Sequence, residues 1–517
     1  MTFEESLKIL FERIVESRDE SSKRQGHEIP LSMVQLGTGK GYFFLGKKRC
    51  KTANETTIDR YIGKTQDVDG HILVLGGAGT GKSSCIAIPT LLTWQGPIFA
   101  IDIKGELTRE WNGYWQKAGW PHKVFEFSCA EGGCRYDPFY FLRESDPNDL
   151  VQNAREIAQA IIPIQADTRE PFWSQAAQNV LTAVILYVCG KETPVLDPDT
   201  NEKTGKVLRG TFNDAMELIQ TKPIWRLIDE IGKSKNEAAI MHINQFREIQ
   251  EPDDNKMLTG IAAELSNRIM SFATDNRIKT AFTPDPKADL LRWEDLENTS
   301  VFIRMPEDKL GQWDGAITLM LTQLIRTLER RPDRYSVEAK ARNLPPVLLL
   351  LDELPRLGKM DVIQNAVSTL RSKGVTICLI MQSLAQLDKT YGREVRRIIV
   401  DNCQYKAILG VTDPDSQKTV SDMIGSISVK TGSVSNTSSI SNGHSTGSSY
   451  GESWTDTDSN SQGRSNNGGF TLSMVREPII FPHELATLKD ILLITPEGFG
   501  RVEKVPYYSS TWKIPKT

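Results

Sequence analysis

One stretch of this chain, residues 71–93, constrains its fold more than any other. Four consecutive apolar residues, 72–75, are typical of a buried strand. Residues 76–83 then read GGAGTGKS, which satisfies the pattern GxxxxGK(S/T) of a phosphate-binding loop between a strand and a helix. A glycine-rich structural turn is the alternative, but the complete motif in its required context favours phosphate binding.

The residue types of this loop each have a chemical role. Glycine has no Cβ, so backbone N–H groups can turn inward around a phosphate, and the dipole of the following helix points its positive end to the same place. Lys82 can reach the β- and γ-phosphates of ATP, and Ser83 can ligate Mg²⁺. Pro89 should kink or shorten the helix that follows. The predicted nucleotide-binding residues are Gly76, Gly77, Gly79, Thr80, Gly81, Lys82, Ser83 and Ser84.

An acidic pair after a second apolar run indicates hydrolysis. Asp352 and Glu353 come directly after residues 347–351, which read VLLLL. Asp352 at a strand end can hold Mg²⁺ through water opposite Ser83, and Glu353 can polarise the attacking water. Capping of the next segment is the alternative role for this pair, but a strand followed by Asp-Glu is what a phosphate loop requires.

Another strand end carries a competing magnesium ligand. Asp102 follows the apolar run 97–101, which places it near the nucleotide edge of a parallel sheet. It lacks an adjacent acid, however, and Lys104 follows closely. We therefore assign the magnesium role to Ser83 and Asp352 and keep Asp102 as the second candidate.

Two polar residues flank the strand predicted at 375–381. Gln382 ends it, where an amide can sense the γ-phosphate or orient water; a turn residue bonded to the backbone is the alternative. Arg371 precedes it and, in a ring of subunits, could reach a neighbour's nucleotide, where an arginine can raise the rate ~10³-fold or more. Arg356 and Lys373 lie nearby, and helix-end arginines are usually solvated, so this assignment stays open. The predicted catalytic residues are Lys82, Glu353, Gln382 and Arg371.

Periodicity and composition divide the chain into parts. Alternating strand and helix patterns surround a block without strands, which we interpret as an all-α insertion in an α/β domain; its polar stretch 197–210 reads as a loop or hairpin. A second block is dominated by Ser, Thr, Gly and Asn, which predicts a mobile loop. The parts are residues 1–70 as a helix and β-like lead-in, 71–165 and 271–425 as the nucleotide-binding domain, 166–270 as the insertion, 426–470 as the mobile loop and 471–517 as a segment returning to the nucleotide domain.

Composition argues against several classes of protein. No run of 18 or more apolar residues exists, and residues 1–20 are charged and amphipathic, so the sequence predicts neither a membrane span nor a signal peptide. The seven cysteines lack framework spacing and are typical of a cytosolic protein. Cys129 and Cys134 lie close together, but no second pair completes a zinc site. A net charge of −4 indicates no bulk attraction to nucleic acid.

These motifs together resemble the type IV secretion coupling proteins, the TraG/TraD family of conjugative-transfer ATPases related to the FtsK and HerA motors. The resemblance covers most of the chain, and its specificity lies in the order of the motifs. The matching segments are GGAGTGKSSCIAIPTLLTW at 76–94, DIKGEL at 102–107, YDPF at 136–139, PFWSQAA at 171–177, LLLLDELPRLGKM at 348–360, MQSLAQL at 381–387 and REPIIFPHEL at 476–485.

The resemblance implies a RecA-like P-loop nucleotide-binding domain with an inserted all-α domain, and homo-hexamers with ATP and Mg²⁺ between subunits. It also implies recruitment of DNA–relaxase cargo or protein effectors, with single- or double-stranded DNA, and their transfer to a type IV secretion channel. By motif position it assigns the phosphate-loop roles to Lys82 and Ser83, the magnesium and water roles to Asp352 and Glu353, the sensor role to Gln382 and the arginine-finger role to Arg371.

The predicted absence of a membrane span departs from this family, whose members commonly carry N-terminal transmembrane helices. We therefore expect a cytoplasmic protein, or one that is peripheral at the inner face of the cell membrane through partners. Two other functions stay open. One is a cytosolic cargo receptor that uses ATP only for release, and the other is a pilus-assembly ATPase of the same superfamily, which the DIKGEL and tail motifs fit less well.

Overall fold

The computed structural model describes residues 34–35, 41–51, 57–115, 121–127, 134–164, 170–196, 203–247, 256–449 and 455–509. The helix predicted near the N-terminus and Cys129 lie outside these residues. The chain divides into two compact units, which are described in turn. One consists of Ile29–Ser416 and Ala486–Thr517, and the other of Met1–Glu28 and Gln417–Leu485.

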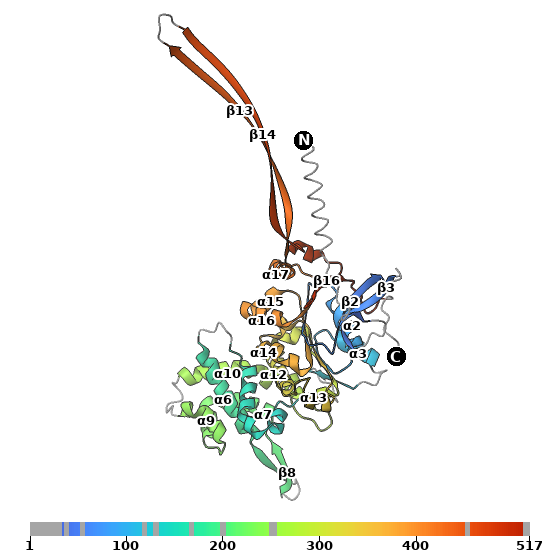
Figure 1. The fold of residues 1–517 in the computed structure, drawn as a ribbon. Coiled ribbons are helices and arrows are strands. Elements are labelled where there is room, and N and C mark those ends of the chain that lie inside the picture. Colours follow the sequence, from blue (N-terminus) through green and yellow to red (C-terminus); the bar gives the residue numbers. More distant parts are fainter. Residues whose placement is uncertain are drawn as a thin grey trace. The chain divides into compact units, whose positions relative to one another are not determined.

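A nine-stranded sheet runs through the larger unit (Figure 1). Its strands in spatial order are β16 (Gly498–Val502), β15 (Ile491–Thr495), β12 (Tyr405–Gly410), β4 (Ile72–Gly76), β11 (Val375–Met381), β10 (Val347–Leu351), β5 (Ile98–Asp102), β9 (Ser300–Arg304) and β6 (His122–Glu126). Neighbours from β12 to β6 are parallel, whereas β15 and β16 are antiparallel additions at one edge. The predicted α/β fold with a mostly parallel sheet is confirmed.

The central strands are apolar along their whole length because helices cover both faces of the sheet. Every residue of β4, β5, β10 and β11 is buried. In Figure 1 two groups of helices lie on opposite sides of these strands. The groups are α2 (Ile88–Thr93) with α3 (Glu106–Trp115), and α12 (Leu310–Glu329) with α14 (Asp361–Thr369), α15 (Leu384–Tyr391) and α16 (Arg393–Asn402).

The helix after the phosphate loop is short, as Pro89 predicts. A π-helical turn, η2 (Ser83–Ala87), leads into α2, and Pro89 lies in the first turn of α2. The backbone stays helical from Ser83 to Thr93, and the π-helical turn directly before Pro89 accommodates the hydrogen bond that proline cannot donate. All six residues of α2 are buried, so this helix anchors the phosphate loop in the core.

A small antiparallel sheet precedes the phosphate loop, in the region where we expected a β-like lead-in. Its strands in spatial order are β1 (Val34–Gln35), β3 (Thr57–Thr65) and β2 (Tyr42–Lys51). Strand β2 is bonded to α2: the Phe44 N–H donates to Thr90 Oγ1 at 3.1 Å, and Thr93 Oγ1 donates to the Tyr42 carbonyl at 2.9 Å. The lead-in therefore supports the helix that begins at the phosphate loop.

The inserted block contains helices and one pair of strands. Its helices are α6 (Pro171–Cys189), α7 (Phe212–Thr221), α8 (Ile224–Gly232), α9 (Glu237–Arg247) and α10 (Lys256–Thr274). Helix α6 packs against the other four and is largely buried, which explains its apolar sequence. Strands β7 (Glu192–Leu196) and β8 (Lys203–Arg209) pair antiparallel, and β8 lies in the polar stretch 197–210, for which a hairpin was one of the two expectations. No helix in the described part of the chain has both the length and the apolar character of a membrane span.

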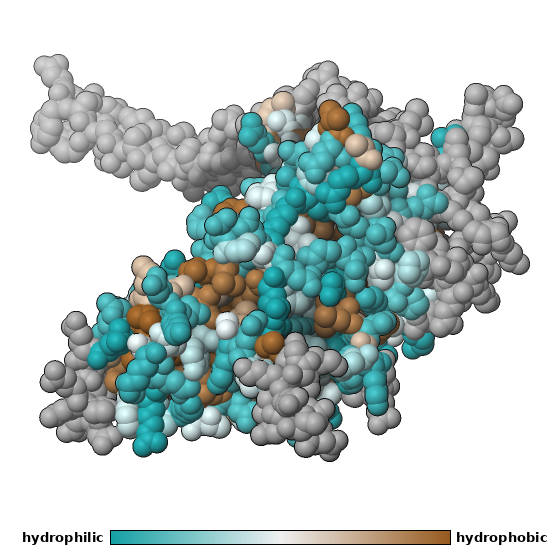
Figure 2. Space-filling model, turned by 90° about the horizontal axis from the view of Figure 1, so that it is seen from below, coloured by the Kyte–Doolittle hydropathy of each residue, from teal (hydrophilic) through white to brown (hydrophobic). Residues whose placement is uncertain are grey.

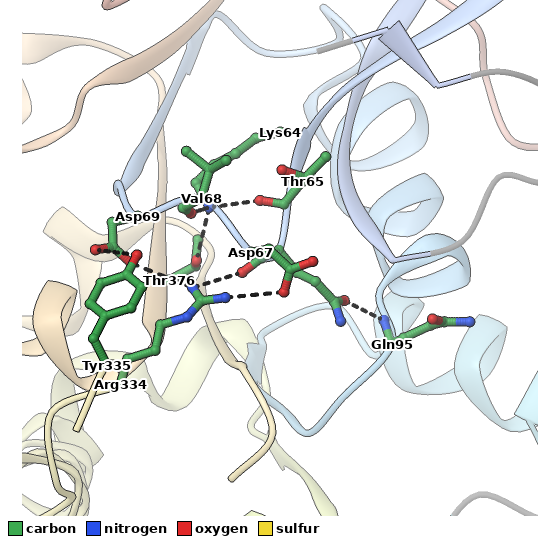
Figure 3. Close-up of polar contacts among 10 residues, drawn as sticks. Lys64, Thr65, Asp67, Val68, Asp69, Gln95, Arg334, Tyr335 and Thr376 are labelled. Atoms are coloured by element: carbon green, nitrogen blue, oxygen red, sulfur yellow. Dashed lines mark hydrogen bonds and ion pairs between the residues drawn. The ribbon is translucent and has the colours of Figure 1, made fainter. Parts of the chain in front are cut away.

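A polar network fixes the lead-in to the sheet at the end away from the phosphate loop (Figure 3). The Arg334 guanidinium lies 3.1 Å from Asp67 and 3.4 Å from Asp69. Lys64, only 1% exposed, donates through Nζ to the Val68 carbonyl and, at 3.3 Å, to Thr376 Oγ1 on β11. Burial and the nearby Arg334 charge lower the pKa of Lys64 to about 7.

The smaller unit contains a long antiparallel hairpin. Strand β13 (Ser426–Ser449) pairs residue for residue with β14 (Thr455–Pro478). We expected a loop over 426–470, and for the described residues this secondary structure was wrong. The loop was predicted because the segment has almost no apolar side chains to bury. A hairpin needs no such core, because its two strands pair their backbone N–H and C=O groups with each other.

The buried Lys64 predicts a particular pH dependence of stability. Between pH 7 and about 10, the unfolded chain holds a proton at Lys64 that the folded chain has lost, so the free energy of unfolding should rise with pH. Replacing Lys64 with Met should remove this contribution, which is at most about 1.4 kcal/mol per pH unit. Urea unfolding of both proteins between pH 7 and 9 measures it. Lys235→Met, at an exposed site, is the control, and parallel curves for Lys64→Met and the wild type would contradict the prediction.

Candidate nucleotide-binding site

The strands that carry the predicted site residues end at the same edge of the sheet. Strands β4, β11, β10 and β5 are successive parallel neighbours, so their carboxyl ends meet. A cleft of about 350 Å³ lies there. It is lined by Ala78, Gly79, Gly81, Lys82, Ser83, Ser84, Ile88, Lys104, Glu106, Arg109, Asp352, Glu353, Gln382, Tyr507 and Tyr508.

The phosphate loop has the backbone that its glycines predict. Gly79 and Gly81 have φ values of 73° and 97°, which side chains disfavour. A Cβ on Gly81 would also lie 2.9 Å from Cys85 Sγ. The loop is held internally by a hydrogen bond of 2.9 Å from Thr80 Oγ1 to the Gly77 carbonyl. Its N–H groups can therefore form a concave anion site.

Lys82 is bonded to its own loop. Its Nζ donates to the carbonyls of Gly76 at 2.7 Å and Gly77 at 3.0 Å. Burial lowers the pKa of Lys82, and the carboxylates of Glu353 and Asp352 oppose this shift. An anionic ligand in the cleft would favour the charged ammonium in the same way.

Asp352 follows β10 directly and faces the same cleft. Burial, followed by the charge of the adjacent Glu353, raises the pKa of Asp352 to about 6, while Lys82 and Lys104 act in the opposite direction. A cation at this point would stabilise the ionised carboxylate. The Asp352 carboxylate and the Ser83 hydroxyl are oxygen ligands of the kind that Mg²⁺ prefers, so these residues fit the predicted ion.

Glu353 and Gln382 form a pair that joins the ends of β10 and β11. Glu353 is 7% exposed and has a φ of 55°, an uncommon conformation for a residue other than glycine. Gln382 Nε2 donates to both carboxylate oxygens of Glu353, at 2.9 and 3.2 Å. The sequence predicted each residue at the nucleotide edge but not this contact, which fixes the direction of the Glu353 carboxylate.

Asp102, the second candidate for magnesium, has another role in the structure. Its Oδ2 accepts hydrogen bonds from the backbone N–H of Thr108 at 2.8 Å and from Thr108 Oγ1 at 2.7 Å. The carboxylate therefore holds the first turn of α3, where a negative charge is favourable. Lys104 and Glu106, which were not predicted as site residues, line the cleft. Their position just after the end of β5 is the sequence feature from which this could have been predicted.

Arg371 lies away from the cleft of its own chain. It is exposed in the 3₁₀ turn η7 (Leu370–Lys373), at the amino end of β11, whereas Gln382 follows the carboxyl end. The seven residues of β11 separate the two ends by about 20 Å. The two basic residues that compete with Arg371 for the arginine-finger role both form ion pairs within the chain. Arg356 pairs with Glu307 at 2.5 Å, and Lys373 pairs with Asp333 at 3.5 Å.

Two tyrosines near the end of the described chain were not predicted as site residues. Strand β16 ends at Val502 and the backbone then turns, which brings Tyr507 and Tyr508 to the cleft. A larger cleft of about 710 Å³ lies between α10, α12 and Lys359, but none of the predicted site residues lines it.

Comparison with known proteins identifies the family. The family model described as Type IV secretory system Conjugative DNA transfer matches residues 42–514. This chain belongs to that family. The Conjugative DNA transfer family was expected from the motifs, and the match extends over nearly the whole described part of the chain.

Individual relatives are more distant. The chain is 24% identical over 473 residues to Protein VirD4 of Rhizobium rhizogenes, covering 89% of this chain and 61% of that protein. It is 24% identical over 391 residues to the Conjugal transfer protein TraG of Escherichia coli, covering 72% and 58%. The chain thus spans about three-fifths of the length of these relatives.

Solved structures share the fold. The bacterial conjugative coupling protein TrwBΔN70 is 16% identical with a TM-score of 0.57, covering 86% of each chain. The plasmid coupling protein TrwB in complex with ADP and Mg²⁺ is also 16% identical with a TM-score of 0.57, covering 88% of this chain and 90% of TrwB. These likenesses confirm the predicted RecA-like fold.

Proposed function

We propose that this chain is an ATP-hydrolysing coupling protein of conjugation. It recruits DNA–relaxase or effector cargo and drives or hands over its transfer to a type IV secretion channel. The proposal is supported by one observation: Lys82, Asp352 and the hydrogen-bonded pair of Glu353 and Gln382 line the same cleft. This set provides a phosphate ligand, a magnesium ligand and an oriented base.

Each residue has a defined part in hydrolysis. Lys82 exchanges its loop carbonyls for the phosphates, and the N–H groups of the loop bind the same anion. Ser83 and Asp352 would hold Mg²⁺, which neutralises charge on the phosphates when bound. TrwB has been solved with an ATP analogue and with ADP and Mg²⁺, which supports this choice of ligands.

Glu353 would accept a proton from the attacking water. Gln382 donates to both of its oxygens, which orients the carboxylate and leaves the remaining lone pairs for water. The same amide would sense the γ-phosphate, because any shift of Gln382 toward the phosphate must break its contact with Glu353. The Glu353–Gln382 pair would therefore couple the presence of the γ-phosphate to the position of Glu353, the general base.

Assembly into a homo-hexamer is part of the proposal. Arg371 is exposed and lies at the edge of the sheet away from its own cleft, so an arginine-finger role requires a neighbouring subunit. A ring would provide it and would give DNA a channel. In this arrangement residues 71–165 and 271–425 bind the nucleotide, and attachment to the inner face of the membrane depends on partners.

The inserted helices favour a second candidate, a cargo receptor that uses ATP only for release. Several of their apolar side chains are exposed, and Figure 2 shows apolar surface over the side of the molecule where these helices lie in Figure 1. The most exposed are Met241 at 78%, Phe172 at 47% and Met270 at 43%. Such side chains suit contact with a protein.

The roles of Lys82 and Glu353 predict different mutant behaviour. Lys82→Ala should lose ATP binding and turnover, because the phosphates lose their charged ligand. Glu353→Gln should bind ATP but not hydrolyse it, because the amide cannot accept the proton. Nucleotide binding and phosphate release measure the two steps. Glu394→Gln, on the exposed surface of α16 and outside the cleft, is the control, and normal turnover by Glu353→Gln would remove Glu353 from the mechanism.

The motor and receptor functions differ in what stimulates ATP turnover. A motor should show a specific ATPase rate that rises with protein concentration and with single-stranded DNA, as the mass from light scattering approaches a hexamer. Lys82→Ala provides the background rate. A specific rate that single-stranded DNA does not raise in the assembled hexamer would contradict the motor and favour the receptor.

A further inference from the structure

The backbone after β16 is fixed at the rim of the nucleotide cleft. The Tyr507 N–H donates to the carbonyl of Ser84, in the turn after the phosphate loop, at 3.0 Å. Lys504 Nζ donates to the carbonyls of Leu409 at 2.7 Å and Leu488 at 3.2 Å. This segment is therefore attached both to η2 and to the sheet, and its path past the cleft is set by the fold.

The Tyr507 side chain strengthens this attachment. Its ring is partly buried against the core that includes residues of α2 and α3, and the charges of Glu110 and Arg109 on α3 act on its hydroxyl. Burial and the Glu110 carboxylate raise the pKa of Tyr507, so the hydroxyl stays protonated at neutral pH. Tyr507 is thus attached through its backbone to the turn after the phosphate loop and through its ring to the core.

Tyr508 has a different environment. Its ring lies edge-on to Tyr507, with centroids 5.3 Å apart and an interplanar angle of 79°, and the residue is 72% exposed. It lines the cleft together with Ile88. An aromatic face turned to solvent at the mouth of a ligand cleft is available for stacking.

The cleft therefore has two chemically different parts. The phosphate loop, Lys82 and Lys104 form a part suited to a polyanion. Tyr507, Tyr508 and Ile88 form a part suited to a flat apolar ring. A nucleoside triphosphate has this same division, with a charged chain at one end and a planar base at the other.

We propose that Tyr508, supported by Tyr507, stacks on the base of the nucleotide whose phosphates lie at Lys82. This inference rests on the proposed nucleotide-binding function and adds the recognition of the base. Stacking uses the π face that every base has, and it does not read the hydrogen-bonding edge. The chain should therefore bind adenine and guanine nucleotides with similar affinities.

The test compares three probes: a non-hydrolysable ATP analogue, the matching GTP analogue and inorganic tripolyphosphate, which has no base. Isothermal titration of the full chain should show that Tyr508→Ala weakens binding of both analogues by about 5- to 150-fold, the range expected for loss of one stacking contact. Binding of tripolyphosphate should stay unchanged. Tyr508→Phe keeps the ring and should bind both analogues within about twofold of the wild type.

Two further variants make the outcomes distinguishable. Tyr335→Ala removes a tyrosine that is 63% exposed and bonded to Asp69, away from the cleft, and should bind all three probes normally. Lys82→Ala should weaken all three. Wild-type affinity of Tyr508→Ala for the analogues, or an equal loss of tripolyphosphate, would overturn the stacking role while leaving the nucleotide site intact. Failure of the wild-type chain to bind any probe would overturn the proposed function itself.

Discussion

The parallel register of β4, β11 and β10 is the constraint on which the rest of the site depends. Parallel strands end together, so the phosphate loop, Gln382 and the acidic pair meet although they are far apart in sequence. A slip of one residue in β10 would turn Asp352 to the other face of the sheet. The unbroken apolar sequence of these strands is thus a condition for the chemistry at their ends.

Two residues of the site, Glu353 and Lys82, are unfavourable to bury among these apolar strands, and each is stabilised by hydrogen bonds with nearby groups. Glu353 has a left-handed backbone, which costs of order 1–3 kcal/mol. Its two hydrogen bonds from Gln382, each of the kind worth about 1.5–3 kcal/mol when one partner is charged, offset this cost. Lys82 is held by two carbonyls of its own loop. Both residues have partners that a ligand can replace, which suits a site that changes state.

Much of the fold and the centre of the site could be predicted from the sequence, because local patterns encode them. The apolar runs at 72–75, 347–351 and 375–381 correctly gave three buried strands, β4, β10 and β11. Other features depend on contacts between distant segments. The Glu353–Gln382 pair, the bond from Thr108 to Asp102 and the arrival of Tyr508 at the cleft each require knowledge of which elements become neighbours. The hairpin β13–β14 escaped prediction because its ladder requires no apolar pattern.

The most direct measurement is a crystal or cryo-electron microscopy structure of this chain with a non-hydrolysable ATP analogue and Mg²⁺. We predict that the phosphates lie in the loop 76–83, that Lys82 Nζ leaves the carbonyls of Gly76 and Gly77 to bind them, and that Mg²⁺ lies between Ser83 and Asp352. A nucleotide bound elsewhere, or a Lys82 that keeps both carbonyls while the nucleotide is bound, would contradict the central claim that this strand edge is the catalytic site.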